Sequence, residues 1–353
     1  MNKYHLLIIS IGFISIATSC ANNNAYNNST SISLSDFNEV VSLHGTVIEF
    51  DDLLMRPVDL HIIDSFLIMK NHGTEYHFHV FNHHNNKKVG ELVEFGNGPQ
   101  DMISPTIISS DDSFLWITDK QKRSIAKCMF YSSGDTTYLS ILNKINVEEY
   151  LDKAAILPNG GILSVAINPQ TEARFHLLDS TGQTINTVGE YPDCGIDFTM
   201  IEKIEAFFCD FAINYPKQRI FMSYKQTDLI EIYDLEGRLI KRMHGPDHFT
   251  PFVKQVNVGD RSMVRTQSGK ARDAYFVPQC VGDEFFVIYS GKVYDREVPS
   301  YLSDKIFVFD HEGNPKRIYE LDMPFYSFAV DPVNRVIYGL SDDPEFHAIN
   351  YHY

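Results

Sequence analysis

Short segments of alternating apolar and polar residues recur along the whole chain, and each is bounded by Gly, Asn, Asp or Ser. A period of two with turn residues between segments is typical of β-strands joined by hairpins. One kind of segment ends in an apolar or aromatic pair before a turn. Its copies are His79–Asn82, Lys127–Tyr131, Phe175–Asp179, Glu231–Asp234, Phe307–Asp310 and His347–Asn350. The pattern therefore predicts six similar β units.

The copies recur at intervals near the roughly 40 to 50 residues of a propeller blade, with longer intervals where the chain has insertions. The last unit ends at Tyr353 without room for a fourth strand, whereas residues 42–50 form a lone strand before the first unit. We therefore predict an all-β fold, a six-bladed β-propeller whose N-terminal strand completes the last blade. A two-sheet sandwich or a pair of small β domains is the competing interpretation. Short helices are expected only at residues 147–153 and 198–208.

The N-terminus has the pattern of an export signal. An apolar run from Leu6 to Ala17 follows a basic start, and it is too short to span a bilayer. The run ends in the segment Ala17–Cys20, which resembles the lipobox of bacterial lipoproteins, although Ala17 stands where Leu is usual. This resemblance implies cleavage before Cys20 and lipidation of Cys20. An ordinary signal peptide followed by an incidental cysteine is the alternative.

These features predict three parts: a lipoprotein signal peptide at residues 1–19, a lipidated flexible tether at 20–32, and the propeller at 33–353. The tether is rich in Asn and Ser and has little apolar surface to bury. We expect the mature protein to be exported and anchored to the lipid bilayer of the bacterial cell envelope through acylated Cys20. The domain is expected on the periplasmic or the surface side of the outer membrane.

Composition narrows the classes of partner. The formal net charge of -16 repels phosphate backbones, so nucleic acid is excluded as an expected partner. The same charge gives no attraction to anionic lipid, so membrane residence depends on the covalent lipid. Aromatic residues make up 13% of the chain, which suits strands.

Three segments carry a family resemblance: Glu94–Pro99, Glu284–Lys292, and residues 328–331 with 337–341. Together they are similar to the TolB-like six-bladed propeller lipoproteins. The resemblance implies the fold and the location, and it brings no catalytic residues. In many relatives Gly-x-Gly-Pro is followed by Gly-Glu, whereas Gln100 and Asp101 follow here. We interpret the glycines as turn residues, because no Lys-Ser/Thr follows to make a phosphate loop.

The long connections, at residues 96–105, 190–208, 244–274 and 290–303, are all expected on the propeller face that carries the links between blades. Long loops on a rigid scaffold commonly carry function. Candidate ligand-binding residues on this face, each after a second strand, are Lys70, Asn71, Asp119, Lys120, Arg123, Asn168, Lys225, Asp228, Lys292, Asp342 and Asp343. Solvated loop ends with no binding role would have the same sequence pattern.

Two functions remain open. The first is a non-enzymatic module that binds a glycan, peptide, metabolite or protein partner and needs no cofactor. The second is a metal-dependent lyase or lactonase, which requires at least three Glu, Asp, Asn or His side chains around a divalent metal in the channel. Alternation on expected inner strands, at residues 58–61, 210–214 and 330–331, places some acids near the channel. Fold alone does not decide between the two functions.

Two further groups have simpler interpretations. His77, His79, His83 and His84 suggest a zinc or nickel site, but no carboxylate or Cys completes the set at ligand spacing, so we interpret them as a solvated hairpin. Cys194 and Cys209 could close a disulfide in an exported protein. Buried free thiols are the preferred interpretation for the cysteines, since Cys128, Cys209 and Cys280 fall within strand patterns.

Overall fold

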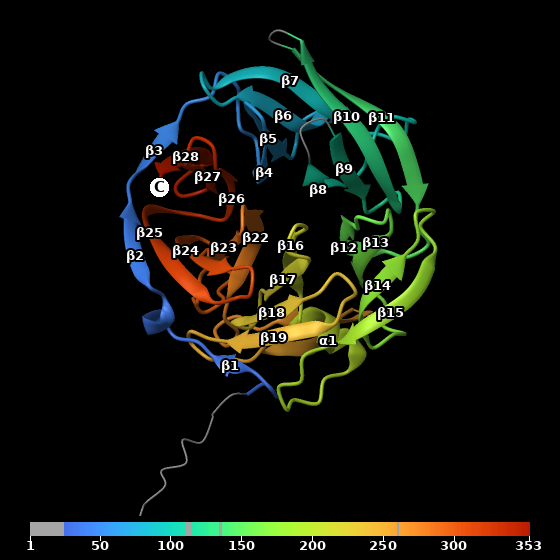
Figure 1. The fold of residues 1–353 in the computed structure, drawn as a ribbon, viewed down its shortest axis with the longest axis vertical. Helices are drawn as coiled ribbons and strands as arrows, with labels where there is room; N and C mark the ends of the chain where they lie inside the picture. Colours follow the sequence, from blue (N-terminus) through green and yellow to red (C-terminus); the bar gives the residue numbers. More distant parts are fainter. Residues whose placement is uncertain (1–24, 111–113, 134–135, 260) are drawn as a thin grey trace, which may run out of the picture.

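The computed structural model describes residues 25–110, 114–133, 136–259 and 261–353. Within these residues, six sheets are arranged in a ring, each with four antiparallel strands, and consecutive sheets are neighbours (Figure 1). Two of the sheets gain a fifth, parallel strand from the N-terminal segment. This arrangement is the predicted six-bladed β-propeller. The sandwich alternative is excluded, because the blades are six separate sheets and a sandwich has two sheets packed face to face.

Each blade begins with its inner strand, next to the ring centre, and three blades cover the first half of the chain. Blade 1 contains β4 (Pro57–Ile63), β5 (Phe66–Asn71), β6 (Tyr76–Asn82) and β7 (Lys87–Glu94). Blade 2 contains β8 (Pro105–Ser110), β9 (Phe114–Asp119), β10 (Ser124–Ser133) and β11 (Thr136–Asn146). Blade 3 contains β12 (Leu151–Ile156), β13 (Ile162–Ala166), β14 (Ala173–Leu178) and β15 (Thr184–Glu190).

The other three blades complete the ring. Blade 4 contains β16 (Cys209–Asn214), β17 (Arg219–Tyr224), β18 (Leu229–Tyr233) and β19 (Leu239–His244). Blade 5 contains β22 (Tyr275–Val281), β23 (Glu284–Tyr289), β24 (Ser303–Asp310) and β25 (Pro315–Phe325). Blade 6 contains β26 (Ser327–Asp331), β27 (Val336–Ser341), β28 (His347–His352) and β3 (Gly45–Ile48).

The predicted repeat and the predicted closure are both confirmed. The six recurring sequence segments lie in or at the ends of β6, β10, β14, β18, β24 and β28, the third strand of each blade. β3 pairs antiparallel with β28, with Ile48 opposite Ala348 and Gly45 opposite Tyr351. The N-terminal strand thus satisfies the edge of the last blade, as closure of a propeller requires.

The segment before β3 wraps the outside of the ring; we call residues 26–44 the N-terminal strap (Figure 1). β1 (Thr30–Ser31) pairs parallel with β19, and β2 (Glu39–Leu43) pairs parallel with β25, with the 3-10 turn η1 (Leu34–Asp36) between them. Tyr26 and Ile32 are buried. The packed part of the chain therefore includes Tyr26, inside the segment expected to be a flexible tether, rather than beginning near residue 33. Cys20 lies outside the described residues.

Phe37 is the strap residue for which we predict a stability effect. Its ring lies 4.7 Å from that of Phe307 and 5.5 Å from that of Phe309, and 7% of the residue is exposed. We expect Phe37→Ala to lower the free energy of unfolding by about 3 kcal/mol, because it leaves a cavity between strap and blade 5. Leu34, 51% exposed, provides the control variant Leu34→Ala. Equal losses for the two variants in urea unfolding would show that the strap is not packed as described.

Two insertions lie on the connections that were expected to be long. The connection from blade 3 to blade 4 contains the helix α1 (Met200–Ala206), which Thr199 and Glu202 cap reciprocally. The connection from blade 4 to blade 5 contains the hairpin of β20 (Val253–Val258) and β21 (Arg261–Thr266), which contacts α1. The helix expected at residues 198–208 is confirmed. The helix expected at 147–153 is wrong, since this segment leads into β12 and its end is in that strand.

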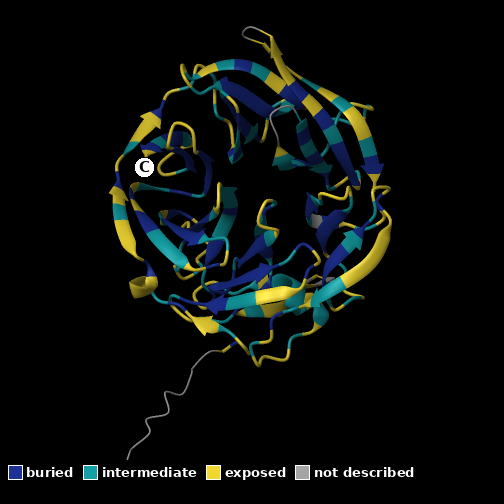
Figure 2. Cartoon of the chain, viewed as in Figure 1, coloured by how far each residue is buried: buried dark blue, intermediate teal, exposed yellow. Residues whose placement is uncertain are grey.

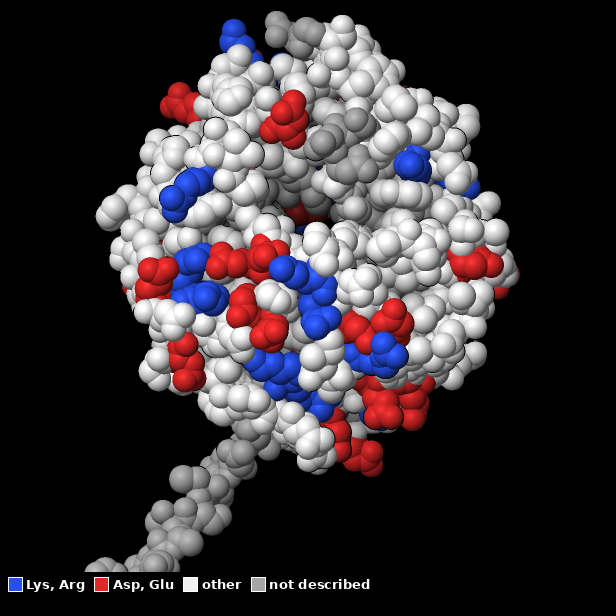
Figure 3. All heavy atoms as spheres, viewed as in Figure 1, with Lys and Arg blue, Asp and Glu red and all other residues white. Residues whose placement is uncertain are grey.

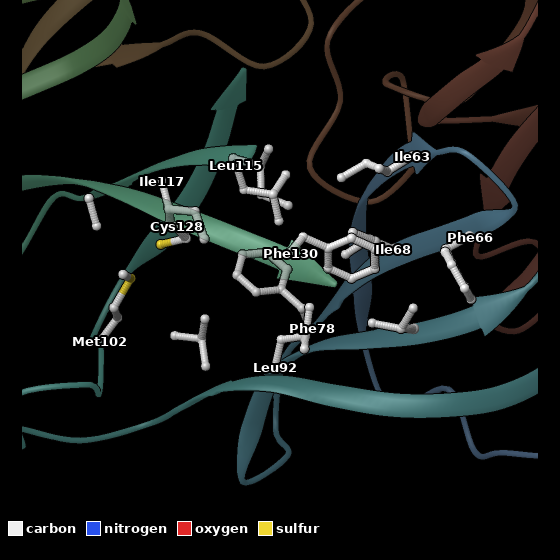
Figure 4. Close-up of a cluster of buried hydrophobic side chains, with 14 of the residues drawn as sticks. Ile63, Phe66, Ile68, Phe78, Leu92, Met102, Leu115, Ile117, Cys128 and Phe130 are labelled. Atoms are coloured by element: carbon white, nitrogen blue, oxygen red, sulfur yellow. The ribbon is translucent and has the colours of Figure 1, made fainter. Parts of the chain in front are cut away.

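The hydrophobic core consists of clusters between neighbouring blades. Figure 4 shows one of them, where Phe78 and Ile68 of blade 1 face Phe130 and Leu115 of blade 2. Buried residues concentrate on the inner and middle strands, and exposed residues on the outermost ones (Figure 2). Each blade thus buries both faces against its neighbours, and the centre of the ring is left for polar side chains.

The Gly96–Pro99 turn has a structural role. Asp101 folds over it and accepts a hydrogen bond from the Gly98 amide at 2.8 Å. A Cβ at Gly96 or Gly98 would meet the Asp101 carboxylate at 2.5 or 2.6 Å. Lys122 closes the turn by donating to the carbonyl oxygens of Gly98 and Asp101. This agrees with the interpretation of the glycines as turn residues.

Candidate functional site

A cavity of about 730 Å³ occupies the centre of the ring. Residues of all six inner strands line it: β4, β8, β12, β16, β22 and β26. The space-filling view shows the ring hollowed at its centre, with acidic side chains visible inside (Figure 3). A volume of this size lies within the range of small-molecule sites, roughly 300 to 1,000 Å³.

Charged side chains gather at one end of the cavity, toward the face with the connections between blades, which we call the long-loop face. Asp59 lies near the start of β4 and is directly opposite Lys70, near the end of β5. Lys153 lies near the start of β12, and Asp210 is the second residue of β16. Lys225 directly follows β17, and its amide donates to Phe208 beside the start of β16. Five charged residues from blades 1, 3 and 4 thus line one cavity, although the sequence separates them widely.

Two lysines neutralise Asp210. One carboxylate oxygen lies 2.5 Å from Lys153 Nζ, and the other lies 3.5 Å from Lys225 Nζ. Burial alone would raise the pKa of Asp210, but the two lysines lower this pKa well below its ordinary value. Lys225 also lies over the rings of Phe208 and Phe276, at 5.0 and 5.7 Å. Asp210 is therefore a fixed anion and unsuited to proton transfer near neutral pH.

Asp59 is held on the opposite wall. Its Oδ1 accepts from the Leu60 amide at 3.0 Å, and its Oδ2 lies 3.1 Å from His61 Nε2. Burial raises the pKa of Asp59, but His61 and the more distant lysines lower it below the ordinary value. Burial lowers the pKa of Lys70, and repulsion from Lys153 acts in the same direction. The end of the cavity is thus an alternating set of cations and anions in a partly desolvated space.

Four side chains of the kinds that the metal-dependent alternative would use line the cavity: Asp59, His61, Asp210 and Asn214. Asn214, at the other end of β16, donates to the Gly282 carbonyl and accepts from the Lys217 amide. Among the residues that the structure describes, no three His, Cys, Asp or Glu side chains are placed to hold a metal ion together. Lys153 and Lys225 pair with Asp210, and lysines act on Asp59 at longer range. Their positive charge opposes that of a divalent cation.

Two of the residues predicted from the sequence reach the cavity. Lys70 and Lys225 both line it, each at the end of a second strand as expected. Of the acids in the three segments placed near the channel from strand alternation, Asp59 and Asp210 line the cavity and Asp331 does not. His61 lines it as well. Lys153 was missed because its segment was interpreted as a helix. The signal that could have identified Lys153 is its position next to the apolar run Ala154–Ile156, which has the pattern of an inner strand.

Three other predicted residues are buried and accept hydrogen bonds from the protein's own backbone. Asn71 and Asp119 are 1% exposed, and Asp228 is fully buried. Asn71 accepts from the amide of Arg56. Asp119 accepts from four amides, those of Ile103, Ser104, Gln121 and Lys122. Asp228 accepts from the amides of Asp247, His248 and Phe249. These side chains position the long connections by satisfying their backbone donors.

The remaining predicted residues lie on the loops of the same face and do not line the cavity. Arg123 donates to the carbonyl of Glu148, and Asn168 accepts from the Gln170 amide. Lys292 donates to the carbonyl of Leu302, and Asp342 accepts from the Tyr301 hydroxyl. Asp343 is exposed, and Lys120 lies 5.1 Å from the centre of the Tyr150 ring. The structure spreads them over several blades, and Lys120 lies near enough to Lys70 for the two charges to repel each other.

The histidines do not form one site. His79 is buried and lies 2.7 Å from Asp52, whereas His77 contacts the Met102 carbonyl oxygen. His83 approaches Tyr338 of blade 6. His84 stays at the hairpin, and its ring is tilted against that of His83 with the centres 4.3 Å apart. The interpretation as a wholly solvated hairpin is wrong for His79, because the preceding connection covers it with Asp52.

The four described cysteines, Cys128, Cys194, Cys209 and Cys280, are free thiols in the structure. Cys128 and Cys209 are buried, and Cys194 and Cys280 are partly buried. Burial raises the pKa of Cys128 to about 12 and that of Cys280 to about 11. Such thiols are weak nucleophiles near neutral pH.

Comparison with known proteins shows similar folds and a matching family. A crystal structure of a member of the DUF4221 family from Bacteroides vulgatus aligns with a TM-score of 0.53 at 11% identity, over 88% of this chain and 95% of that one. The crystal structure of a "Putative exported protein" from Bacteroides fragilis aligns with a TM-score of 0.49 at 12% identity, over 91% and 99%. No curated protein matches the sequence. The model of the family described as TolB-like 6-blade propeller-like matches residues 36–332. The chain therefore belongs to the TolB-like six-bladed propeller family.

Proposed function

We propose that this chain is a non-enzymatic binding module of the cell envelope that takes a small polar ligand into the long-loop end of the central cavity. The observation that carries the proposal is the 730 Å³ cavity lined by Asp59, Lys70, Lys153, Asp210 and Lys225. A few convergent polar groups in a concave site of this size are the usual mark of a ligand pocket. Neither carboxylate has the raised pKa that a general acid needs.

The proposed location rests on the N-terminal sequence. An apolar leader that ends at Cys20 supports export and lipidation. The described part of the chain contains no helix with the length and apolarity needed to cross a bilayer. Tyr26 is buried, and its hydroxyl donates to Thr227 at 2.8 Å. Since a chain spans at most about 3.6 Å per residue, the lipid on Cys20 would hold the rim at blade 4 within roughly 20 Å of the membrane surface.

An experiment that compares two Lys–Asp pairs tests the binding site. One pair, Lys153 with Asp210, lies in the cavity, and the other, Lys217 with Asp283, lies at 3.2 Å on exposed turns outside it. The double variants K153M/D210L and K217M/D283L both conserve net charge. We expect the cavity variant to bind at least tenfold more weakly, because a polar ligand loses its hydrogen-bond partners there, and the turn variant to bind like the parent chain.

Binding is measured by calorimetry on the detergent-solubilised full chain, with neutral and acidic sugars, amino acids and dipeptides as probes. Circular dichroism checks that both variants are folded. Replacement of a buried ion pair by apolar residues is often neutral for stability, so the cavity variant is expected to fold. Unchanged affinity in K153M/D210L, or binding of no probe by the parent chain, would contradict the proposal.

A further inference from the structure

Cations outnumber anions where charged side chains gather in the cavity. Three lysines, Lys70, Lys153 and Lys225, and two aspartates, Asp59 and Asp210, line it. This local excess of positive charge stands against a formal net charge of -16 for the whole chain. Anions near the protein are therefore repelled by most of its surface, and the cavity offers them a place of the opposite sign.

The carboxylates of the two aspartates already have ion-pair or hydrogen-bond partners within the protein. Both carboxylate oxygens of Asp210 face lysines, at 2.5 and 3.5 Å. Both oxygens of Asp59 have partners, the Leu60 amide and His61 Nε2. Protein acceptors in the cavity are thus largely satisfied by protein donors. A ligand that offered only donors would have to displace one of these contacts.

Lys70, in contrast to the two aspartates, has no hydrogen-bond or ion-pair partner among the described residues. Its attraction to Asp59 and Asp119 acts at longer range, and among the described residues no oxygen lies within hydrogen-bond or ion-pair distance of its Nζ. The side chain is partly buried, and burial together with repulsion from Lys153 lowers its pKa. An ammonium group with three donors and no acceptor in a partly desolvated space is left to be completed by an anion from outside.

The cavity is also too large for an inorganic ion alone. It holds about 730 Å³, and its walls include apolar residues such as Ile62, Ile108 and Val277 beside the charged ones. Such walls favour a molecule with an organic body attached to its charged group.

We infer that the ligand is a small organic anion, a carboxylate or a phosphate ester, whose charged group binds at Lys70 while its body occupies the central cavity. This inference rests on the proposed binding function and names its ligand class. Lys153 lies near enough to add attraction, since it already repels Lys70. The Lys70 contact selects acids over neutral molecules of the same shape.

The test uses matched acidic and neutral probes. Calorimetry on the detergent-solubilised full chain measures D-glucuronate against D-glucuronamide for the carboxylate arm, and D-glucose 6-phosphate against D-glucose for the phosphate arm. We expect the acid of at least one arm to bind tenfold or more tightly than its neutral counterpart. Lys70→Met should weaken this acid at least tenfold, whereas Lys217→Met, on the exposed turn, should leave it unchanged.

The outcomes separate this inference from the proposed function. If neutral and acidic probes bind equally, or if Lys70→Met binds the acid like the parent chain, the anion inference is overturned. The binding function would still stand if K153M/D210L abolished binding. If no probe binds, both fail. Lys70→Gln serves as a second variant, with circular dichroism to confirm its fold, so that misfolding of the Met variant does not leave the inference untested.

Discussion

Replacement of Glu231 by alanine is expected to lower the free energy of unfolding by about 3 to 5 kcal/mol. Glu231 is fully buried on β18 and is the acceptor for three donors. Tyr224 and Tyr233 donate their hydroxyls to its Oε2, and Arg242 donates to its Oε1 at 2.6 Å. Without the carboxylate, two buried hydroxyls and a largely buried guanidinium lose their partner, and no water replaces it.

Glu236 is the matched control for Glu231. It lies in the turn after β18, is exposed, and pairs with Arg238 at 3.1 Å. Because exposed ion pairs contribute little, Glu236→Ala should change the free energy of unfolding by less than about 1 kcal/mol. Both variants are compared by urea unfolding followed by tryptophan fluorescence and circular dichroism. A loss below about 1 kcal/mol for Glu231→Ala would show that the buried network is not formed as described.

The second large effect is expected at Asp228, a residue that the sequence presented as a ligand contact. Its carboxylate is fully buried, accepts from three amides of the connection after β19, and lies 3.1 Å from His244 Nε2. Asp228→Ala leaves these donors unpaired inside the protein, each at a cost of about 1 to 3 kcal/mol when no water reaches it. We expect a total loss of about 3 to 5 kcal/mol in the free energy of unfolding, measured by urea denaturation.

Asp343 provides the comparison for Asp228, because it was predicted from the sequence by the same argument and is exposed. Asp343→Ala should stay within about 0.5 kcal/mol of the parent chain. The second measurement is the affinity of each variant for a probe that the parent chain binds, determined by calorimetry at a temperature well below the unfolding transition. Asp228→Ala that keeps full stability but loses binding would return Asp228 to the ligand site, contrary to its internal role.

The local pattern of the sequence was sufficient for the blades. Strand alternation and the turn residues after each third strand are properties of short segments, and they lie where the structure has β6, β10, β14, β18, β24 and β28. Asp179, Asp234 and Asp310 each accept from the backbone of their own hairpin, so the turns too are determined locally. The missing fourth strand of the last unit was enough to predict that β3 closes the ring.

The N-terminal strap was not predictable in the same way. Its Asn- and Ser-rich sequence has the composition of a tether, yet Tyr26 packs edge-on against His244 at 4.8 Å. β1 and β2 gain their hydrogen bonds from the edges of blades 4 and 5, which lie far away in sequence. A polar segment can be ordered by partners that its own composition does not reveal.

For the site, the sequence by itself determined the fold, the closure and the face that carries the long connections. It could not tell Lys70 and Lys225, which line the cavity, from Asp119 and Asp228, which hold loops in place. All four stand at or near the end of a second strand, and their sequence contexts are alike. Only the tertiary structure decided which side chains meet, because the ring brings strands from blades 1, 3 and 4 around one axis. Convergence across a propeller depends on distances between blades, and the period-two pattern within a strand contains no information about them.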